Sequence, residues 1–392
     1  MWNISQAFRQ ELRSPNQQTA ARAQLLDSDF KEVPDGDFFT AGADDFQDYI
    51  VDGNVDIDFS RGTRRTAELT ILNTDGEFTP TNATTDYDGK FYVNRNIRLF
   101  RGVVLSGGTT VYAPIGTFMI DSLDVLVERN MTLMNFTLSD HWKKLQKSLI
   151  TRTWTHPAGT PINDSIRSLA GNAGADYPLA PALDPLDSRS NKTLTTAIKF
   201  ERGDSRGDKM KEIANKYGID IFFNQEGRLV SQDRKTPKDA QEVWHFYSSS
   251  STVTSGMLVS VRRTLTDDNL YNHVFVIGTG NPTSPVIYEA KTTTASSTIS
   301  IDRIGDRVKI LEGSWKTQEQ VNAAGEKLWA QRFNLFEEVV IDTICNPALD
   351  ADDVIRITEP YSKLSGLYRI NTMNVPLTTS KQTISCIRNI YA

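Results

Sequence analysis

The stretch GTFMIDSLDV at residues 116–125 recurs without gaps as GLYRINTMNV at residues 366–375. The identical positions are Gly116 and Gly366, Ile120 and Ile370, and Val125 and Val375. A short Ile-Arg segment precedes each copy, at 96–99 and 354–357, and another alternating segment follows each, at 131–136 and 382–387. Because the flanking segments agree in order, we expect one β-module to occur twice in this chain.

A hairpin is predicted in the first copy by VDGNVDIDFSRGTRRTAELTIL, residues 51–72. Apolar and polar residues alternate over 55–59 and again over 67–71, with Gly62 between the two runs. Period-two alternation on both sides of a turn is typical of two antiparallel strands with one apolar face.

The polar residues of this hairpin are our candidate lumen-facing or interface-facing residues: Asp56, Asp58, Arg64, Arg65 and Glu68. Asp56 and Asp58 should project from the same side of a strand, about 7 Å apart. Cross-strand charge pairing with the arginines near the turn is then expected. A metal site would need a third carboxylate on a fixed loop, so the pattern favours a polar sheet surface, and we assign no metal ligands.

Bulk composition excludes several classes of protein. The chain has 392 residues, a formal net charge of −6 and a pI near 5.4, which argues against a general binder of nucleic acid or anionic membranes. We expect neither a signal peptide nor a membrane span, since no apolar run approaches about 18 residues. The two cysteines, Cys345 and Cys386, form no disulfide framework, which suits synthesis in a reducing cytoplasm.

The order of patterns predicts a mostly β protein with an α+β insert. We expect an N-terminal helical arm at 1–29, with a helix over 3–13 and a second segment, 16–26, that is either a helix or an extended arm. The predicted domains that follow are a first β-domain at 30–140, a smaller α/β insert at 141–248, and a second β-domain at 249–392 with one long helix over about 318–336.

Catalytic constellations are missing from the sequence. None of the four histidines lies in an HExxH or HxH motif, and no G-x-S-x-G motif is present. We therefore assign no catalytic and no cofactor-binding residues, and predict that the chain is not an enzyme.

In order and pattern, most of the chain resembles the tail-tip or baseplate-hub proteins of tailed bacteriophages, including minor tail proteins. The segments that carry this resemblance are Gly53–Leu72 with the loop 73–80, Asn94–Leu99, Gly116–Ile120, Lys216–Asp220 with the hairpin 224–230, and Asp352–Ile357 through 366–370.

The resemblance implies two tail-tube-like β-barrel or sandwich domains flanking the smaller α/β domain. It further implies a homotrimer whose six β-domains form a pseudo-sixfold ring, joining a hexameric tail tube to a threefold tip while DNA passes through without specific binding. The implied partners are a distal-tail or tail-tube ring protein, tip, fibre or spike proteins, and the tape-measure protein. The implied location is the virion, after synthesis in the host cytoplasm, with roles in host attachment and genome ejection and with no cofactor.

Two alternatives stay open. A receptor-binding or carbohydrate-binding tail protein would use loops 72–91 and 278–298, which contain few aromatic residues. A tail-associated cell-wall hydrolase would have its active site within 145–245, where no pair of acid and nucleophile can be named.

Overall fold

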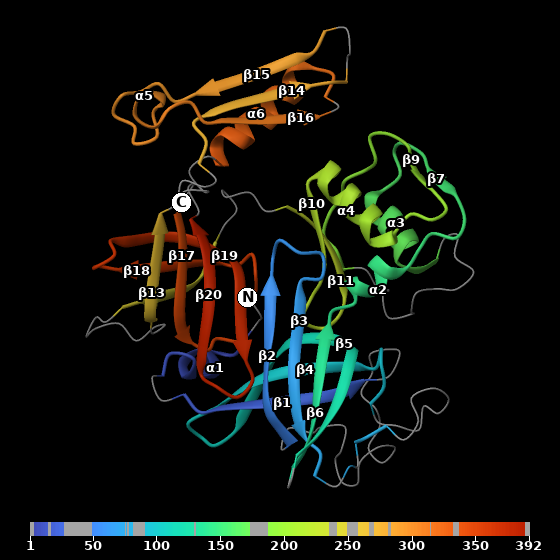
Figure 1. Cartoon of the computed structure of the whole chain (residues 1–392), viewed down its shortest axis with the longest axis vertical. Coiled ribbons are helices and arrows are strands. Elements are labelled where there is room, and N and C mark those ends of the chain that lie inside the picture. Colours follow the sequence, from blue (N-terminus) through green and yellow to red (C-terminus); the bar gives the residue numbers. More distant parts are fainter. Residues whose placement is uncertain are drawn as a thin grey trace.

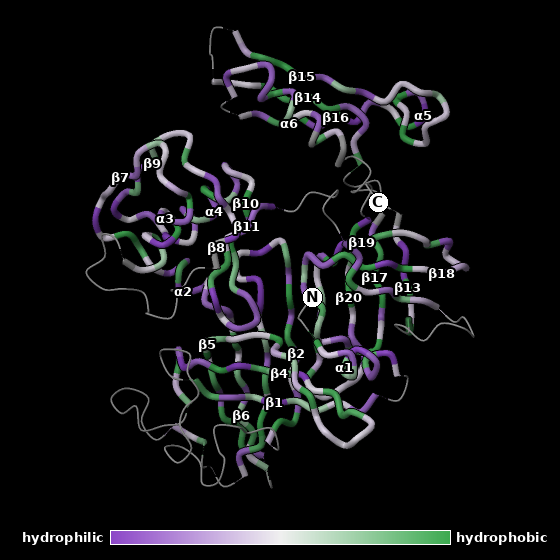
Figure 2. Tube along the Cα trace, turned by 180° about the vertical axis from the view of Figure 1, so that it is seen from behind, coloured by the Kyte–Doolittle hydropathy of each residue, from purple (hydrophilic) through white to green (hydrophobic). Residues whose placement is uncertain are grey.

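A computed structural model describes residues 4–14, 17–26, 49–74, 76, 78–80, 91–128, 131–172, 187–234, 241–248, 258–265, 270–280, 284–313, 315–331 and 337–388. Two β-modules form the lower body, the insert lies beside its upper end, and a small α/β unit lies above (Figure 1). Hydrophobic positions alternate with hydrophilic ones along the strands of both modules (Figure 2).

The first module is a sheet with the strand order β1-β4-β5-β6-β3-β2. Its strands are β1 (Thr19–Leu26), β2 (Ile50–Asp58), β3 (Arg65–Leu72), β4 (Asn96–Val104), β5 (Thr110–Glu128) and β6 (Met131–Ser139). A short helix, α1 (Gln6–Glu11), precedes them and is capped by the side chain of Ser5.

The second module has the strand order β12-β18-β19-β20-β17-β13. Its strands are β12 (Glu242–Tyr247), β13 (Leu258–Leu265), β17 (Glu337–Ile344), β18 (Val354–Glu359), β19 (Leu364–Pro376) and β20 (Lys381–Arg388). Strand for strand, this is the order of the first module. The two modules differ at the outermost strand, because β1 runs antiparallel to β4 whereas β12 runs parallel to β18.

The two copies also agree in register. The pairing of β5 with β6 shifts by one residue between Ile120 and Ser122, and that of β19 with β20 shifts between Ile370 and Thr372. These β-bulges stand at equivalent positions of the sequence repeat. A bulge at the same place in both copies is what a duplicated module is expected to retain, because β-bulges are kept within families.

A left-handed residue is repeated as well. Asn94, before β4, has φ 73°, and Asp352, before β18, has φ 75°. Each donates its backbone N–H to the isoleucine carbonyl at the bulge, Asn94 to Ile120 at 2.8 Å and Asp352 to Ile370 at 2.9 Å. Asn and Asp tolerate this conformation better than other residues with side chains, so the sequence matches the backbone in both copies.

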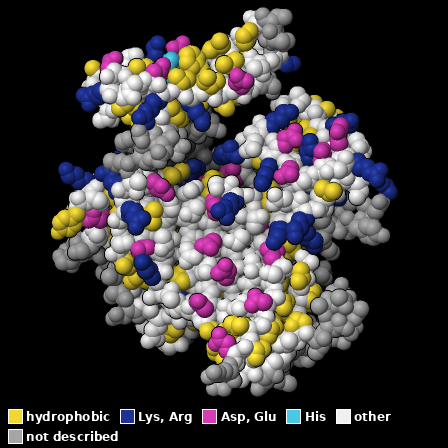
Figure 3. All heavy atoms as spheres, viewed as in Figure 1, with side chains coloured by type: hydrophobic (Ala, Val, Ile, Leu, Met, Phe, Trp, Pro, Cys, Tyr) yellow, Lys and Arg dark blue, Asp and Glu magenta, His cyan; other side chains and the backbone are white. Residues whose placement is uncertain are grey.

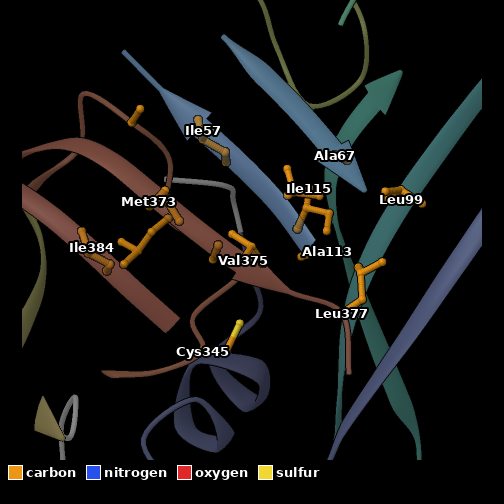
Figure 4. Packing of buried hydrophobic residues seen from close by; sticks show 14 of the residues in the cluster. Ile57, Ala67, Leu99, Ala113, Ile115, Cys345, Met373, Val375, Leu377 and Ile384 are labelled. Atoms are coloured by element: carbon orange, nitrogen blue, oxygen red, sulfur yellow. The ribbon is translucent and has the colours of Figure 1, made fainter. Parts of the chain in front are cut away.

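The modules merge into one 12-stranded sheet across the described residues, because β2 pairs antiparallel with β19. Their buried side chains form a single hydrophobic cluster, in which Ile57 lies close to Met373 and Val375 (Figure 4). We expect the two modules to unfold together, since neither has a core of its own.

The insert has a separate core. Its elements are α2 (Trp142–Lys147), β7 (Trp154–His156), α3 (Ile162–Arg167) with a π-turn at 168–172, β8 (Asp187–Ser188), β9 (Ile198–Phe200), α4 (Arg206–Tyr217), β10 (Ile219–Phe223) and β11 (Leu229–Asp233). The helix α4 ends at Gly218, which has the left-handed conformation with φ 61° that is typical of a glycine after the last helical residue.

A further unit lies within the predicted second domain. It comprises β14 (His273–Gly278), β15 (Val286–Lys291), β16 (Val308–Gly313), α5 (Ile301–Ile304) and α6 (Gln318–Gln331). The three strands form their own sheet, and Val274, Val276 and Val321 form their own cluster. This unit is inserted between β13 and β17, where the first module has only the tight β2–β3 turn.

The fold class is confirmed: the chain is mostly β, with two similar β-modules flanking a smaller α/β domain. Three expectations need correction. Residues 19–26 of the predicted helical arm are the strand β1, because they pair with β4 along their whole length and residues 23–26 are buried. The insert does not extend to 248, since β12 pairs with β18. The predicted helix 318–336 is present over the described residues Gln318–Gln331, but it packs on the separate three-stranded sheet and not on the second module; residues 332–336 lie outside the described ranges.

Candidate functional site: a polar sheet face and two buried arginine junctions

One face of the merged sheet is polar across both modules. A single row of cross-strand neighbours runs through six strands and consists of Thr66, Asp56, Asn374, Thr383, Asp342 and Ser260. The row beside it in the first module consists of Ser122, Thr137, Glu68 and Asn54. The face therefore presents hydroxyls, amides and carboxylates in place of the apolar side chains on the core side.

Carboxylates outweigh cations on this face. In these rows and beside them on the same face, the acidic side chains include Asp56, Glu68, Asp124, Glu338 and Asp342, whereas the cations include Lys381 of β20 and Arg262 at the β13 edge. Acidic side chains, drawn in magenta, are spread over the central part of this side of the molecule (Figure 3).

Hydrogen bonds hold these carboxylates in place. Asn374 Nδ2 donates to Asp56 Oδ1 at 2.7 Å, and Asn135 Nδ2 donates to Asp124 Oδ2 at 3.0 Å. Hydrogen bonding from Lys381 lowers the pKa of Asp342 to about 2. The face is thus a fixed array of small polar groups.

Two of the five predicted residues, Asp56 and Glu68, are exposed on this face. Asp58 is half-buried and holds the turn instead, because its carboxylate accepts from Ser60 and pairs with Arg61 at 2.8 Å. The predicted cross-strand pairing between the aspartates and Arg64 or Arg65 is absent from the described contacts.

The prediction that Arg64 and Arg65 face a lumen or partner is wrong. Their side chains are 3% and 0% exposed, so neither reaches the surface of the chain. Arg65 occupies the same face of β3 as Ala67 and Leu69, which are in the core. The period-two pattern already indicates that Arg65 lies on the core side, since residues 65, 67 and 69 share one side of a strand.

Arg65 joins three parts of the chain at one point. Its Nη2 lies 2.6 Å from both carboxylate oxygens of Asp350, in the loop before β18, and its Nη1 donates to the carbonyl of Phe223, in the insert, at 2.5 Å. Burial alone would raise the pKa of Asp350, but the guanidinium groups of Arg65 and Arg64 hold it below its ordinary value. The pair ties the first module to the second module and to the insert.

Arg64 and Asp140 complete this junction. The guanidinium of Arg64 stacks on Phe222 at 4.1 Å and donates to the carbonyl of Ala351 at 3.0 Å. Asp140 Oδ2 accepts from the backbone N–H groups of Arg64 and Arg65, at 2.8 and 3.0 Å. Burial raises the pKa of Asp140 to about 6 despite these hydrogen bonds.

The β10–β11 turn docks the insert on both modules. Gln225 donates to Asp350 Oδ2 at 2.7 Å, and its carbonyl accepts from the hydroxyl of Thr117 at 3.0 Å. The carbonyl of Glu226 accepts from Arg98 Nη2 at 3.3 Å. Sequence reasoning missed this contact because nothing local marks a turn that binds residues more than a hundred positions away.

A second buried arginine joins the two modules away from the insert. Arg101 of β4 donates to the carbonyl of Leu377 and, at 2.6 Å, to that of Thr379, both just beyond β19. It also donates to Thr19 of β1 at 2.7 Å. The two arginine junctions thus connect the modules at places outside the β2–β19 pairing.

Two features are absent from the described residues: a cluster of metal ligands and a helix able to cross a membrane. No group of three or more His, Cys, Asp and Glu side chains is arranged there to hold a metal ion. Among the helices of those ranges, none has both the length and the apolar character needed to cross a membrane.

Solved structures of two tail proteins and of a VgrG complex share this fold over nearly the whole chain. A tail protein from Neisseria meningitidis MC58 superposes with a TM-score of 0.67 at 11% identity, covering 94% of this chain and 96% of that one. The 43 kDa tail protein of prophage MuSo2 from Shewanella oneidensis has a TM-score of 0.65 at 10% identity, covering 95% and 99%. A chain of the half-lidded Francisella PdpA–VgrG complex has a TM-score of 0.57 at 11% identity, covering 96% and 59%.

No protein-family model and no curated sequence matches this chain. The solved structures confirm the predicted resemblance to phage tail proteins as a shared fold, at a sequence identity too low to transfer individual residues.

Proposed function

We propose that this chain is a structural hub protein of a phage tail tip, acting through subunit contacts and not through chemistry. Three copies would form a pseudo-sixfold ring that joins a hexameric tail tube to a threefold tip. The neighbours in such a particle are a tail-tube or distal-tail ring protein above, a spike or fibre protein below, and the tape-measure protein.

The observation that carries this proposal is the duplicated module. The same six strands occur twice in the same order, with the bulge and the left-handed residue repeated. Three chains would present six nearly equivalent sheets, and a closed ring of them matches sixfold and threefold neighbours at once.

The polar face suits the wall of a DNA channel. Its carboxylates repel phosphate, whereas lysine and arginine would neutralise phosphates and retain the DNA. Asp56, Glu68 and Asp124 are the residues that we propose line the lumen.

Native mass spectrometry of the full chain tests the assembly. We expect a species of three times the 43.9 kDa chain mass at micromolar concentration, or after mixing with the tube protein of the same phage. A chain that stays monomeric under both conditions would contradict the hub proposal.

The two alternatives have less support in the described contacts. Phe78 and Phe91, which a carbohydrate-binding loop would need at the surface, are 2% and 0% exposed. In the insert, His156 contacts the hydroxyls of Ser165 and Ser168 at 3.0 and 3.3 Å, but Ser165 is fully buried, so its Oγ is inaccessible to a substrate.

A further inference from the structure

The second half of β5 has one edge with no strand beside it in the described part of the chain. β4 pairs with Thr110–Met119, and β6 pairs with Met119–Glu128 on the opposite side. Beyond the bulge, this edge of β5 also exposes apolar surface, since Leu126 is 43% and Val127 is 73% exposed. An open, partly apolar edge is a template for another strand.

The equivalent edge of β19 is covered within the chain. There β2 pairs antiparallel with Thr372–Pro376, so that Val55 lies opposite Val375 and Asp56 lies opposite Asn374. The Asn374 side chain donates to Asp56 at 2.7 Å across this pairing. The pairing of β2 with β19 therefore shows, within one chain, how a strand can pair with the edge that is equivalent to the open edge of β5.

The strand that corresponds to β2 is β13. Each is the last strand of its module, and β13 pairs with β17 on one side and with no described strand on the other. Following cross-strand neighbours from one strand to the next aligns the two modules. From β5 to β2 the neighbours are Ile120, Leu138, Ala67 and Val55. From β19 to β13 they are Ile370, Cys386, Val339 and Arg263. Arg263 thus occupies on β13 the position of Val55 on β2.

Within one chain, β13 cannot cover the β5 edge. The strands β6, β3, β2, β19, β20 and β17 lie between them in the sheet. The partner for the β5 edge is consequently the β13 of a second copy, and each copy has one donor edge and one acceptor edge.

We infer that β13 of one copy adds antiparallel to the 122–126 edge of β5 in the next copy. Transfer of the β2–β19 register places Thr264 opposite Asp124, Arg263 opposite Val125, and Arg262 opposite Leu126. The contact is heterologous, and repeated contacts of this kind give a ring when the rotation between copies closes, which the proposed assembly requires after three copies. This inference rests on the proposed assembly and adds the surface and register through which it forms.

Charge and apolar area agree with this register. Arg262 would lie on the polar face between Asp124 and Glu128, its diagonal neighbours on the other copy, and all three side chains are exposed in the chain alone. Opposite charges at such cross-strand positions are favourable. On the other face, Val261 would lie opposite the exposed Val127 and cover it.

Disulfide trapping tests the register. In the variant Asp124→Cys with Thr264→Cys, oxidation should link each copy to the next and give covalent trimers on a non-reducing gel. The native cysteines, Cys345 and Cys386, are both buried and should stay out of the reaction. The matched control is Leu126→Cys with Thr264→Cys, which displaces one partner by two residues, about 7 Å, and should link far less.

The outcomes separate this inference from the proposed function. A chain that forms trimers in native mass spectrometry but links no better at 124 and 264 than in the control contradicts the inference and leaves the hub proposal standing. A chain that neither trimerises nor links contradicts both.

Charge exchange gives an independent readout. Arg262→Glu should weaken trimer formation by about tenfold, because it places a third carboxylate between Asp124 and Glu128. Adding Asp124→Lys and Glu128→Lys to that variant should restore the trimer. If Arg262→Glu assembles like the wild type, or if the triple variant is not rescued, the inferred register is wrong.

Discussion

Arg65 is the residue whose environment differs most from its sequence context. It lies beside another arginine at a turn, yet its guanidinium is buried against Asp350 and the carbonyl of Phe223. Breaking a buried ion pair from one side leaves the other charge unpaired in the interior, which costs far more than an exposed pair.

We predict that Arg65→Met lowers the free energy of unfolding by about 3–5 kcal/mol. Glu68→Gln, on the exposed side of the same strand, is the control and should change it by less than about 0.5 kcal/mol. Urea unfolding followed by tryptophan fluorescence measures both. Equal stability of the two variants would show that the Arg65 junction is not structural.

His141 gives the junction a dependence on pH. It is buried beside Phe223, contacts Asn96 at 3.1 Å, and burial, with Lys144 nearby, lowers its pKa to about 3. The unfolded chain binds this proton near pH 6.5, the folded chain only near pH 3. The stability that neutral His141 contributes is present above pH 6.5 and is lost as the pH falls from there toward 3.

Between about pH 7 and about pH 5, we expect the wild type to lose about 2 kcal/mol more than His141→Gln. The raised pKa of Asp140 acts in the opposite direction, but it is common to both proteins. Urea midpoints at the two pH values measure the difference. If wild type and variant lose stability in parallel, His141 titrates as an ordinary surface histidine.

At this scale the sequence allows only part of the site to be predicted. Asp56 and Glu68 could be placed on a polar face because alternation alone determines it. The same alternation puts Arg65 on the core side, but its charge argues for the surface. Only its partners Asp350 and Phe223, both far along the chain, make its burial possible.

Among the elements, the bulge and the left-handed residue fix each copy of the module. Asn94 is exposed, and its φ of 73° is required for the hydrogen bond to Ile120.

We predict that Asn94→Val lowers stability by about 1–2 kcal/mol, because a β-branched side chain is strained in this conformation. Asn94→Gly should cost less than about 0.5 kcal/mol, since glycine adopts positive φ freely. Thermal unfolding measures the pair. A valine variant as stable as the glycine variant would mean that the turn relaxes without loss.

Strong alternation of apolar and polar residues made most strands of both modules predictable. The duplication was predictable as well, because Gly116–Val125 and Gly366–Val375 retain the same pattern. The pairing partners were less accessible. The local pattern of β1 fits a helix or an arm as well as a strand, and that of β12 fits the insert, since each is recognised as part of a module only by pairing with β4 or β18.

For the whole molecule, the charge of the sheet face is the property that the proposed function uses. Replacing carboxylates with lysines should convert a surface that repels DNA into one that binds it.

We predict that Asp56→Lys, Glu68→Lys and Asp124→Lys together give binding of duplex DNA that weakens steeply with salt, whereas the wild type shows none at about 150 mM salt. Asp302→Lys, Glu312→Lys and Glu319→Lys, which change the same net charge on the separate α/β unit, are the control. Fluorescence anisotropy of labelled DNA measures both. Binding as strong in the control would show that net charge, and not this face, is responsible.

The merging of two modules through β2 and β19 could not be predicted from the sequence, because it joins residues about three hundred positions apart and leaves no local pattern. It is also the feature that makes a ring of whole chains conceivable, since it shows how one module docks on the next.

Electron cryomicroscopy of the assembled chain, alone or at the tip of an isolated tail, tests the central claim most directly. We predict a ring of three chains in which six similar sheets surround a channel, with Asp56, Glu68 and Asp124 on its inner wall. A monomer, a ring of another copy number, or a trimer with this face turned outward would contradict the account.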